Sequence, residues 1–281
     1  MSAAIPQPMV LCTIGDLFLD VVVLPDALLT ADEDTPATIG LRAGGQAANV
    51  AAWASALGAT GRILCKRGSD TVSKLAAAEL ESYGVEIRGP VVPGRSGVVV
   101  SVREASGQRT MASDRGVAPL LKPGEIDAGW VTTADVLHVS GYCLFHETSA
   151  AAAIEAAASA ARVTVDLSSA EGIRRLGVER FSALLAALRP EVVFATETER
   201  AVIPDFPTRW VTKLGPRGAA FPEGTYPARS TDPVDTTGAG DALAAGYLLG
   251  GPELAMEAAA RCVNLIGAMP EPINRARRCG R

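Results

Sequence analysis

The stretch from Asp235 to Asp241, near the C-terminus, reads Asp-Thr-Thr-Gly-Ala-Gly-Asp and combines residue types that suit phosphoryl transfer. Gly238, Ala239 and Gly240 carry almost no side chain, so the amides along this turn, including that of the final aspartate, can close on an anion. The apolar run that follows predicts a helix, whose positive N-terminal end favours phosphate. Asp241 places a carboxylate beside this predicted anion hole, where an attacking hydroxyl must lose its proton. The alternative is a glycine-rich turn in which Asp241 only stabilises the helix N-terminus.

A second stretch, Gly44-Gly-Gln-Ala-Ala-Asn49, precedes small and apolar residues that recur at helical spacing until Gly58. Two adjacent glycines, Gly44 and Gly45, let a ligand approach the backbone closely. Asn49 falls in the first turn of the predicted helix and offers both a donor and an acceptor to neighbouring hydroxyls. The alternative for Asn49 is a helix-capping role.

Two other phosphate-binding motifs are excluded by the sequence. No Gly-x-x-x-x-Gly-Lys-Ser/Thr occurs, which removes the Walker loop. The segment beginning at Gly238 has Leu243 where a dinucleotide fingerprint needs its third small residue, so a dehydrogenase is disfavoured.

Together, the two stretches resemble the two signatures of the ribokinase-like (PfkB) carbohydrate kinase family, and the resemblance runs from about Cys12 to about Gly267. It implies ATP-dependent phosphorylation of a sugar-like alcohol, with Mg²⁺ beside the nucleotide. In this family's pattern Asp241 is the general base, and the Gly44–Asn49 stretch lies on the acceptor side.

The short apolar run from Met9 to Ile14 predicts a buried strand whose end delivers Asp16 to the ligand edge of a sheet. The resemblance assigns this acidic residue to substrate hydroxyls, with Asp20 as a weaker alternative. A loop aspartate that caps local amides is the other interpretation of Asp16.

The nucleotide side of the resemblance is less complete. The family usually has Asn-x-x-Glu where this chain has Thr196 and Glu199, and Glu197 competes with Glu199 for the role of organising the magnesium–phosphate shell through water. A solvated acidic turn is the alternative. The resemblance also assigns Thr196 to the nucleotide, together with four further residues: Lys213, Gly215 and Gly218 in a glycine-containing loop, and Asn264 in an adenine-side helix within Pro252 to Ala268.

The elements that must position these residues alternate between short apolar strands and helices, which predicts an α/β fold with a doubly wound, mostly parallel sheet. Strands over Ser96–Val102 and Arg109–Ala112, around a turn at Ala105–Gln108, predict a small β-sheet lid made from segments 17–43 and 90–118. Thr30 to Leu41 is expected to be a polar loop. Residues 1–281 then form one kinase domain, with a flexible tail over 270–281.

Composition limits the other possibilities. With 281 residues, 48% of them hydrophobic, the chain has ample core for one large domain, and its net charge of −5 with scattered signs gives no nucleic-acid surface. Five cysteines without paired spacing favour the cytoplasm, and no apolar run suggests a membrane span. The two histidines, His138 and His146, do not have a metal-ligand spacing.

We therefore expect a kinase that moves the γ-phosphoryl group of ATP to a hydroxyl of a sugar or sugar-like alcohol. A nucleoside kinase is the alternative within the fold, although no aromatic residue occurs between Gly84 and Gly129 to stack on a base. A sugar- or nucleotide-binding protein with little turnover is the alternative from another class. The lid is a candidate homodimer surface, and the family's final segment, which can contribute to a monovalent-cation site, is largely absent.

Overall fold

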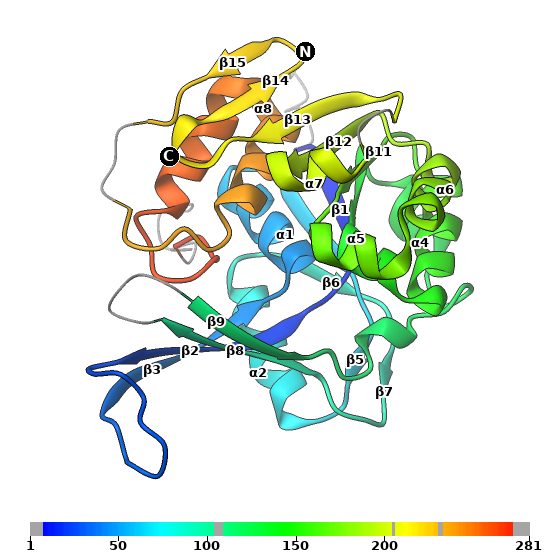
Figure 1. The fold of residues 1–281 in the computed structure, drawn as a ribbon. Coiled ribbons are helices and arrows are strands. Elements are labelled where there is room, and N and C mark those ends of the chain that lie inside the picture. Colours follow the sequence, from blue (N-terminus) through cyan, green and yellow to red (C-terminus); the bar gives the residue numbers. More distant parts are fainter. Residues whose placement is uncertain (1–7, 104–108, 204–205, 230–232, 272–281) are drawn as a thin grey trace, which may run out of the picture.

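A computed structural model describes residues 8–103, 109–203, 206–229 and 233–271, and within them a nine-stranded sheet forms the centre of the protein (Figure 1). In spatial order its strands are β15 (Gly224–Tyr226), β14 (Ala219–Phe221), β13 (Arg209–Lys213), β12 (Val192–Thr196), β11 (Val163–Asp166), β10 (Val136–Ser140), β1 (Val10–Ile14), β4 (Thr60–Leu64) and β6 (Glu86–Arg88). The strands from β13 to β6 pair in parallel, and β14 and β15 add an antiparallel edge. The predicted doubly wound, mostly parallel α/β fold is confirmed.

Helices cover both faces of this sheet because the central strands are apolar on both sides. On β1, Leu11 packs into one core cluster, and Cys12 and Ile14 pack into the cluster on the opposite face. The first face carries α1 (Gln46–Ala56), α2 (Thr71–Ser82) and α8 (Ala239–Cys262). The second face carries α3 (Ala128–Thr132), α4 (Glu147–Ser159), α5 (Ala170–Leu176), α6 (Val178–Leu188) and α7 (Glu197–Val202).

A separate four-stranded sheet, the lid sheet, extends from one side of the molecule (Figure 1). Its order is β3 (Ala37–Gly44), β2 (Phe18–Pro25), β8 (Gly97–Arg103) and β9 (Arg109–Asp114). The expectation of a loop through Leu41 was wrong, because the residues from Ala37 onward pair along the full length of β2. Most side chains of β3 remain solvent-accessible, so the strand lacks the alternation of buried and exposed residues that marks a half-buried strand. The turn expected at Ala105–Gln108 lies outside the described residues.

Short elements complete the described chain. Strands β5 (Arg67–Gly68) and β7 (Val91–Val92) pair in parallel, and 3₁₀ turns occur at η1 (Ala118–Leu120), η2 (Gly141–Phe145) and η3 (Gly215–Arg217). Helix α8 is kinked by non-helical backbone at Gly250 and Gly251 and ends at Cys262, so Asn264 lies beyond the helix expected to carry it. Most of the expected tail, 272–281, lies outside the described residues.

The described part of the chain contains no helix that is both long and apolar enough to cross a bilayer. Four cysteines are buried as free thiols: Cys12, Cys65, Cys143 and Cys262. They fill the core as small apolar residues do.

Asp70 joins the helix layer to the lid sheet. Its carboxylate caps α2 by accepting from the Ser73 amide at 3.0 Å and also accepts from the Ser96 amide, beside β8, at 2.9 Å. Partial burial raises the pKa of Asp70, but these two hydrogen bonds leave it below its ordinary value of 3.8. A carboxyl with a lowered pKa stabilises the folded protein above that value and loses this effect as the pH falls.

We predict that Asp70→Ala lowers the free energy of unfolding at pH 7 by about 1–2 kcal/mol, the usual cost of losing an N-cap. Asp70→Ser keeps a capping oxygen for Ser73 but cannot hold Ser96 as well, so its loss should be smaller. Urea denaturation of the three proteins at pH 7, and again below pH 3.8, measures both effects. An Asp70→Ala difference that stays the same at low pH would contradict this account.

Candidate active site

The Asp235–Asp241 loop is held in shape by its first aspartate. One carboxylate oxygen of Asp235 accepts from the amide and hydroxyl of Thr237 at 2.8 and 2.6 Å, and the other accepts from the Gly267 amide at 3.0 Å. Gly238 caps α8 with a φ of 75°, and a Cβ there would lie 2.5 Å from the Cβ of Ala268. The loop therefore requires glycine at this position both for its conformation and for its packing.

The amides of this turn are only partly committed to the helix. The Asp241 amide donates to the Gly238 carbonyl at 3.0 Å, whereas the Ala239 amide makes a longer bond of 3.4 Å to the Thr236 carbonyl. A bond of that length is weak enough to be exchanged for a phosphate oxygen. A Cβ on Gly240 would lie 3.3 Å from the Lys213 Nζ, so this ammonium group lies directly over the turn.

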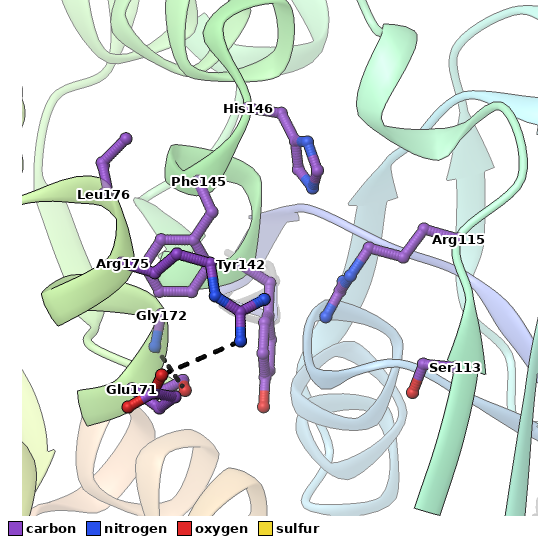
Figure 2. A pocket seen from close by; sticks show the side chains of 10 residues that line it. Ser113, Arg115, Tyr142, Phe145, His146, Glu171, Gly172, Arg175 and Leu176 are labelled. Atoms are coloured by element: carbon purple, nitrogen blue, oxygen red, sulfur yellow. Dashed lines mark hydrogen bonds and ion pairs between the residues drawn. The ribbon is translucent and has the colours of Figure 1, made fainter.

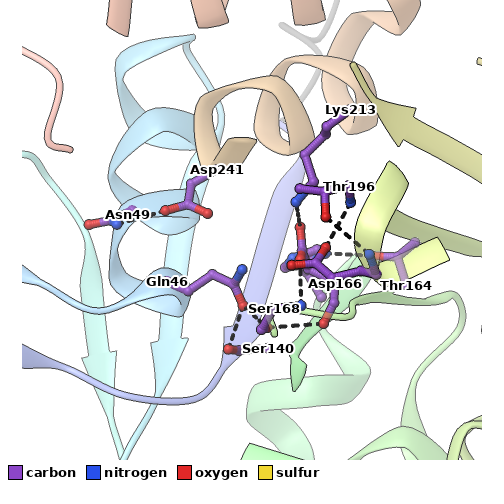
Figure 3. A network of polar contacts seen from close by, with 11 residues as sticks. Gln46, Asn49, Ser140, Thr164, Asp166, Ser168, Thr196, Lys213 and Asp241 are labelled. Atoms are coloured by element: carbon purple, nitrogen blue, oxygen red, sulfur yellow. Dashed lines mark hydrogen bonds and ion pairs between the residues drawn. The ribbon is translucent and has the colours of Figure 1, made fainter. Parts of the chain in front are cut away.

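Asp241 is 9% exposed and points into the protein from the first turn of α8. Its Oδ2 accepts from the Asn49 Nδ2 at 2.7 Å (Figure 3). Burial raises the pKa of Asp241 from 3.8 to about 7, while Asn49, Lys213 and Gln46 oppose the rise. A carboxyl with a pKa close to neutrality is well matched to accepting a proton at physiological pH.

Asn49 connects the two glycine-rich stretches through its Nδ2, and its Oδ1 can still accept a hydrogen bond. It is buried in the first turn of α1, and its Oδ1 has no hydrogen-bond partner within the described residues. A buried acceptor without a partner is costly, so this atom is ready to accept a hydrogen bond from a ligand hydroxyl. The structure thus brings Asn49 and Asp241 together, although 192 positions separate them in the chain.

The glycines before α1 allow a close approach of two aspartates. Gly45 has a φ of 100°, and a Cβ there would lie 2.4 Å from the Asp16 carbonyl oxygen. A Cβ on Gly44 would lie 2.1 Å from the Asp20 carboxylate. Side chains at these two positions would push the acidic residues away from the start of α1, so the glycines are needed for the architecture of the site itself.

Asp16 follows β1 and is buried, and it forms an ion pair with Arg115, which follows β9 of the lid sheet. Burial raises the pKa of Asp16 to about 6, and the guanidinium of Arg115 opposes this rise. Asp20 is not part of this pair: it lies in β2, opposite Arg42 of β3, and burial also raises its pKa to about 6. Of the two aspartates considered, Asp16 is therefore the one joined to both the sheet edge and the lid.

A polar network that the sequence analysis did not identify lies between Asp241 and the ends of the central strands (Figure 3). The Lys213 ammonium bonds the buried Asp166 carboxylate at 2.7 Å, and the Gln46 Oε1 accepts from Ser140 and Ser168 at 2.6 and 2.5 Å. Burial lowers the pKa of Lys213, but the charges of Asp166, Glu199 and Asp241 raise it above its ordinary value. The sequence signal was present, because Ser140 and Asp166 end parallel strands at the edge where ligands bind.

Thr196 and Glu199 form a reciprocal helix cap at the start of α7. The Thr196 hydroxyl accepts from the Glu199 amide at 3.2 Å, and a Glu199 carboxylate oxygen accepts from the Thr196 amide at 2.7 Å. Glu199 is buried on the Lys213 side, whereas Glu197 is exposed and ion-paired with Arg217. Geometry therefore places Glu199, rather than Glu197, beside the network.

The other residues assigned to the nucleotide lie in different surroundings. Gly215 has a φ of 60° and open space where a Cβ would point, so a ligand can approach it. Gly218 has a φ of 99° and packs against the backbone of Tyr226, which gives it a structural reason to be glycine. Asn264 is exposed in the segment after α8.

The described residues contain no group of three His, Cys, Asp or Glu side chains disposed to bind a metal directly. Mg²⁺ commonly keeps several waters and takes only one or two carboxylates together with substrate phosphates. The carboxylates of Asp166, Glu199 and Asp241 already act on the Lys213 ammonium, so a Mg²⁺ ion beside them would be held through water and substrate phosphates.

The doubly wound sheet, the lid sheet and the buried carboxylate beside a glycine-rich turn are the arrangement expected of a phosphotransferase with an alcohol group as acceptor. The model of the pfkB family of carbohydrate kinases matches residues 10–269, and the chain belongs to this family. Its relatives include an ATP-dependent ribose-1-phosphate kinase of Halopiger xanaduensis, 33% identical over 270 residues that cover 88% of each chain.

Solved structures share the fold. Adenosine kinase from Sinorhizobium meliloti superimposes with a TM-score of 0.82 at 22% identity, covering 98% of this chain and all of the other. An uncharacterized sugar kinase from Pyrococcus horikoshii in complex with ATP gives a TM-score of 0.77 at 22% identity, covering 92% and 95% of the two chains.

The raised pKa of Asp241 predicts a pH-dependent stability difference. The carboxyl titrates near 7 when folded and near 3.8 when unfolded, so the folded state retains the proton over this interval and its stability falls as the pH rises. Asp241→Asn cannot ionise, and we expect its melting temperature to exceed that of the natural protein by more at pH 8 than at pH 5. Calorimetry at both pH values checks this, and a constant difference would contradict burial of a charged carboxylate.

Proposed function

We propose that the protein transfers the γ-phosphoryl group of ATP to a hydroxyl of a sugar or sugar-like alcohol, with Asp241 as the general base. The observation that carries this proposal is the position of Asp241. Its buried carboxylate has a pKa of about 7, is oriented by Asn49 at 2.7 Å, and lies in the first turn of a helix whose N-terminal end can bind phosphate. Few structural roles require a carboxylate to be buried in this way.

In the proposed reaction, the acceptor oxygen attacks the γ-phosphorus as the bond to the bridging oxygen of ADP breaks. The hydroxyl proton passes to the Asp241 carboxylate, and the negative charge leaves with ADP. Charge on the transferred group is stabilised by the amides of the 238–241 turn, chiefly those of Gly238, Ala239 and Gly240, and by the Lys213 ammonium that lies over Gly240. Lys213 would then exchange part of its contact with Asp166 for the phosphate.

The acceptor is proposed to lie between Asp241 and Asp16. The unpaired Oδ1 of Asn49, in the first turn of α1, and the Asp16 carboxylate, after β1, would bind its hydroxyls, and Gly44 and Gly45 would let it approach the backbone. The names of the similar proteins include kinases of ribose 1-phosphate and of adenosine, so likeness alone does not identify the acceptor.

The nucleotide is proposed to lie along the far side of the turn. Gly215 has open space beside its backbone, where the nucleotide can approach. The resemblance assigns Thr196, Gly218 and Asn264 to the same ligand, and Glu199, at the start of α7, would hold Mg²⁺ through water. When bound, the metal neutralises charge on the ATP phosphates. The reduced, buried cysteines are compatible with the cytoplasm as the site of this reaction.

We predict that Asp241→Asn lowers kcat by about 10²- to 10⁴-fold, the usual contribution of a positioned acid–base group. ADP release is measured with ATP, with and without Mg²⁺, against pentoses, hexoses, their phosphates, sugar acids and nucleosides. Circular dichroism confirms that the variant is folded. If Asp241→Asn retained most of the natural kcat, the proposal would be overturned. It would also fail if the natural protein turned over no acceptor, a result that would favour a binding protein.

The lid sheet is proposed as the surface of a homodimer. Ile39 and Leu41 are 61% and 49% exposed and pair in register with Val23 and Val21, which places these four apolar residues on one face of the lid sheet. Exposed apolar faces of this kind are common at protein interfaces. Light scattering should show a dimer for the natural protein and a monomer for Ile39→Glu/Leu41→Glu. A natural protein that stays monomeric at micromolar concentration would contradict the proposal.

A further inference from the structure

A cavity of about 420 Å³ opens beside the acceptor region, between the lid sheet and the segments that follow β10 and β11 (Figure 2). The side chains that matter for its chemistry are Ser113, Arg115, Tyr142, His146, Glu171 and Arg175. Its size lies within the range of small-molecule sites, roughly 300–1,000 Å³. None of the residues assigned to the base, the anion-binding turn or the nucleotide lines it.

Arg115 connects this cavity to the acceptor region. Its guanidinium donates to Asp16 on one side and lines the cavity on the other, so both spaces share a wall. Asp16 in turn touches the start of α1 through the close approach of its carbonyl to Gly45. A substrate whose hydroxyl reaches Asp241 would therefore extend toward this cavity with its other end.

Two arginines and a histidine reach the cavity from three separate elements. Arg115 follows β9, His146 precedes α4, and Arg175 lies in α5 (Figure 2). Burial lowers the pKa of His146, and the charge of Arg115 lowers it further, so the standing positive charges of the cavity are those of Arg115 and Arg175, beside an imidazole that can donate a hydrogen bond. Glu171 is the opposing charge, but it is 70% exposed and meets the 80% exposed Arg175 only at 3.8 Å, a pair that solvent weakens.

The aromatic residues of the cavity are already engaged, which argues against a stacked base. The Arg115 guanidinium carbon lies 4.4 Å from the Tyr142 ring centroid, and the Tyr142 ring meets Phe145 edge-on at 6.0 Å. Phe145 packs against Phe181 and lies against Gly172, where a Cβ would be 2.5 Å from its ring. The cavity therefore offers cations and hydroxyls rather than a free aromatic face.

We propose that this cavity binds a phosphate ester carried by the acceptor, so that the preferred substrate is a sugar phosphate with its reacting hydroxyl at Asp241. Arg175 and His146 contact the ester from one side, and Arg115 and Ser113 contact it from the lid side. This inference rests on the proposed function, because it concerns the far end of the same acceptor. In this proposal Arg115 and Arg175 select between a sugar and its phosphate ester, whereas Asp241 and the 238–241 turn act on both kinds of acceptor.

The test compares matched acceptor pairs. The value of kcat/KM is measured by ADP release for ribose with its 1- and 5-phosphates and for fructose with its 1- and 6-phosphates. The natural protein should prefer an ester, and Arg175→Gln should lower the ratio of kcat/KM for ester over sugar by about 10-fold, as loss of a charge-assisted hydrogen bond does. Arg175→Lys, which keeps the charge, should restore part of that ratio.

Arg174→Gln is the matched control, because Arg174 is the exposed neighbour on α5 and does not line the cavity. Its ratio should equal that of the natural protein. Equal use of sugars and esters, a preference for nucleosides, or the same ratio in Arg174→Gln and Arg175→Gln would each overturn the inference while leaving the kinase activity established.

Calorimetric titration of the same acceptor pairs without ATP separates the two proposals. If the natural protein turns over no acceptor but binds an ester more tightly than its sugar, and Arg175→Gln loses that difference, the proposed function fails and the anion cavity stands. If it binds esters and sugars alike, the inference fails regardless of turnover.

Discussion

The site depends on keeping the Asp241 carboxylate buried yet close to ionisation. Removing a carboxyl from water raises its pKa, and a fully isolated one would stay protonated and useless as a base. Here the Asn49 hydrogen bond and the Lys213 charge offset part of the burial, which holds the pKa at about 7. Because Asn49 belongs to α1 and Lys213 ends β13, this balance exists only when distant parts of the chain are folded together.

The same constraint explains the polar network below the turn. Lys213 serves a buried carboxylate, Asp166, and also lies over Gly240, so its ammonium connects the end of β11 to the anion-binding turn. Gln46 is fixed by two serines from the ends of β10 and β11, and it opposes the raised pKa of Asp241. On the opposite side, the ion pair of Asp16 and Arg115 joins the end of β1 to the lid sheet. Under the proposed function, phosphate chemistry and acceptor selection thus use separate groups on one sheet edge.

Sequence patterns predicted the parallel sheet and the turns at the two glycine-rich stretches, because alternating strands and helices and short glycine motifs can be recognised locally. They failed where partners decide the structure: the residues of β3 show no clear alternation and form a strand by pairing with β2, and β14 and β15 are too short to show a period. Asp166 and Ser168 gave no motif, and the Gly44–Asn49 stretch did not indicate the partners of Gln46, since these contacts join segments that are distant in the chain. Arg115 belongs to no motif in the sequence, and only tertiary structure places it against Asp16.

The most direct test of the account is the ionisation of Asp241 in the folded protein, followed by ¹³C NMR of labelled aspartate carboxyl groups. The account predicts one resonance that titrates near pH 7, is absent in Asp241→Asn, and shares its apparent pKa with the acid limb of the pH dependence of kcat/KM. An Asp241 resonance that titrates near the ordinary value of 3.8, or a pH–rate profile unrelated to it, would contradict the assignment of Asp241 as the base.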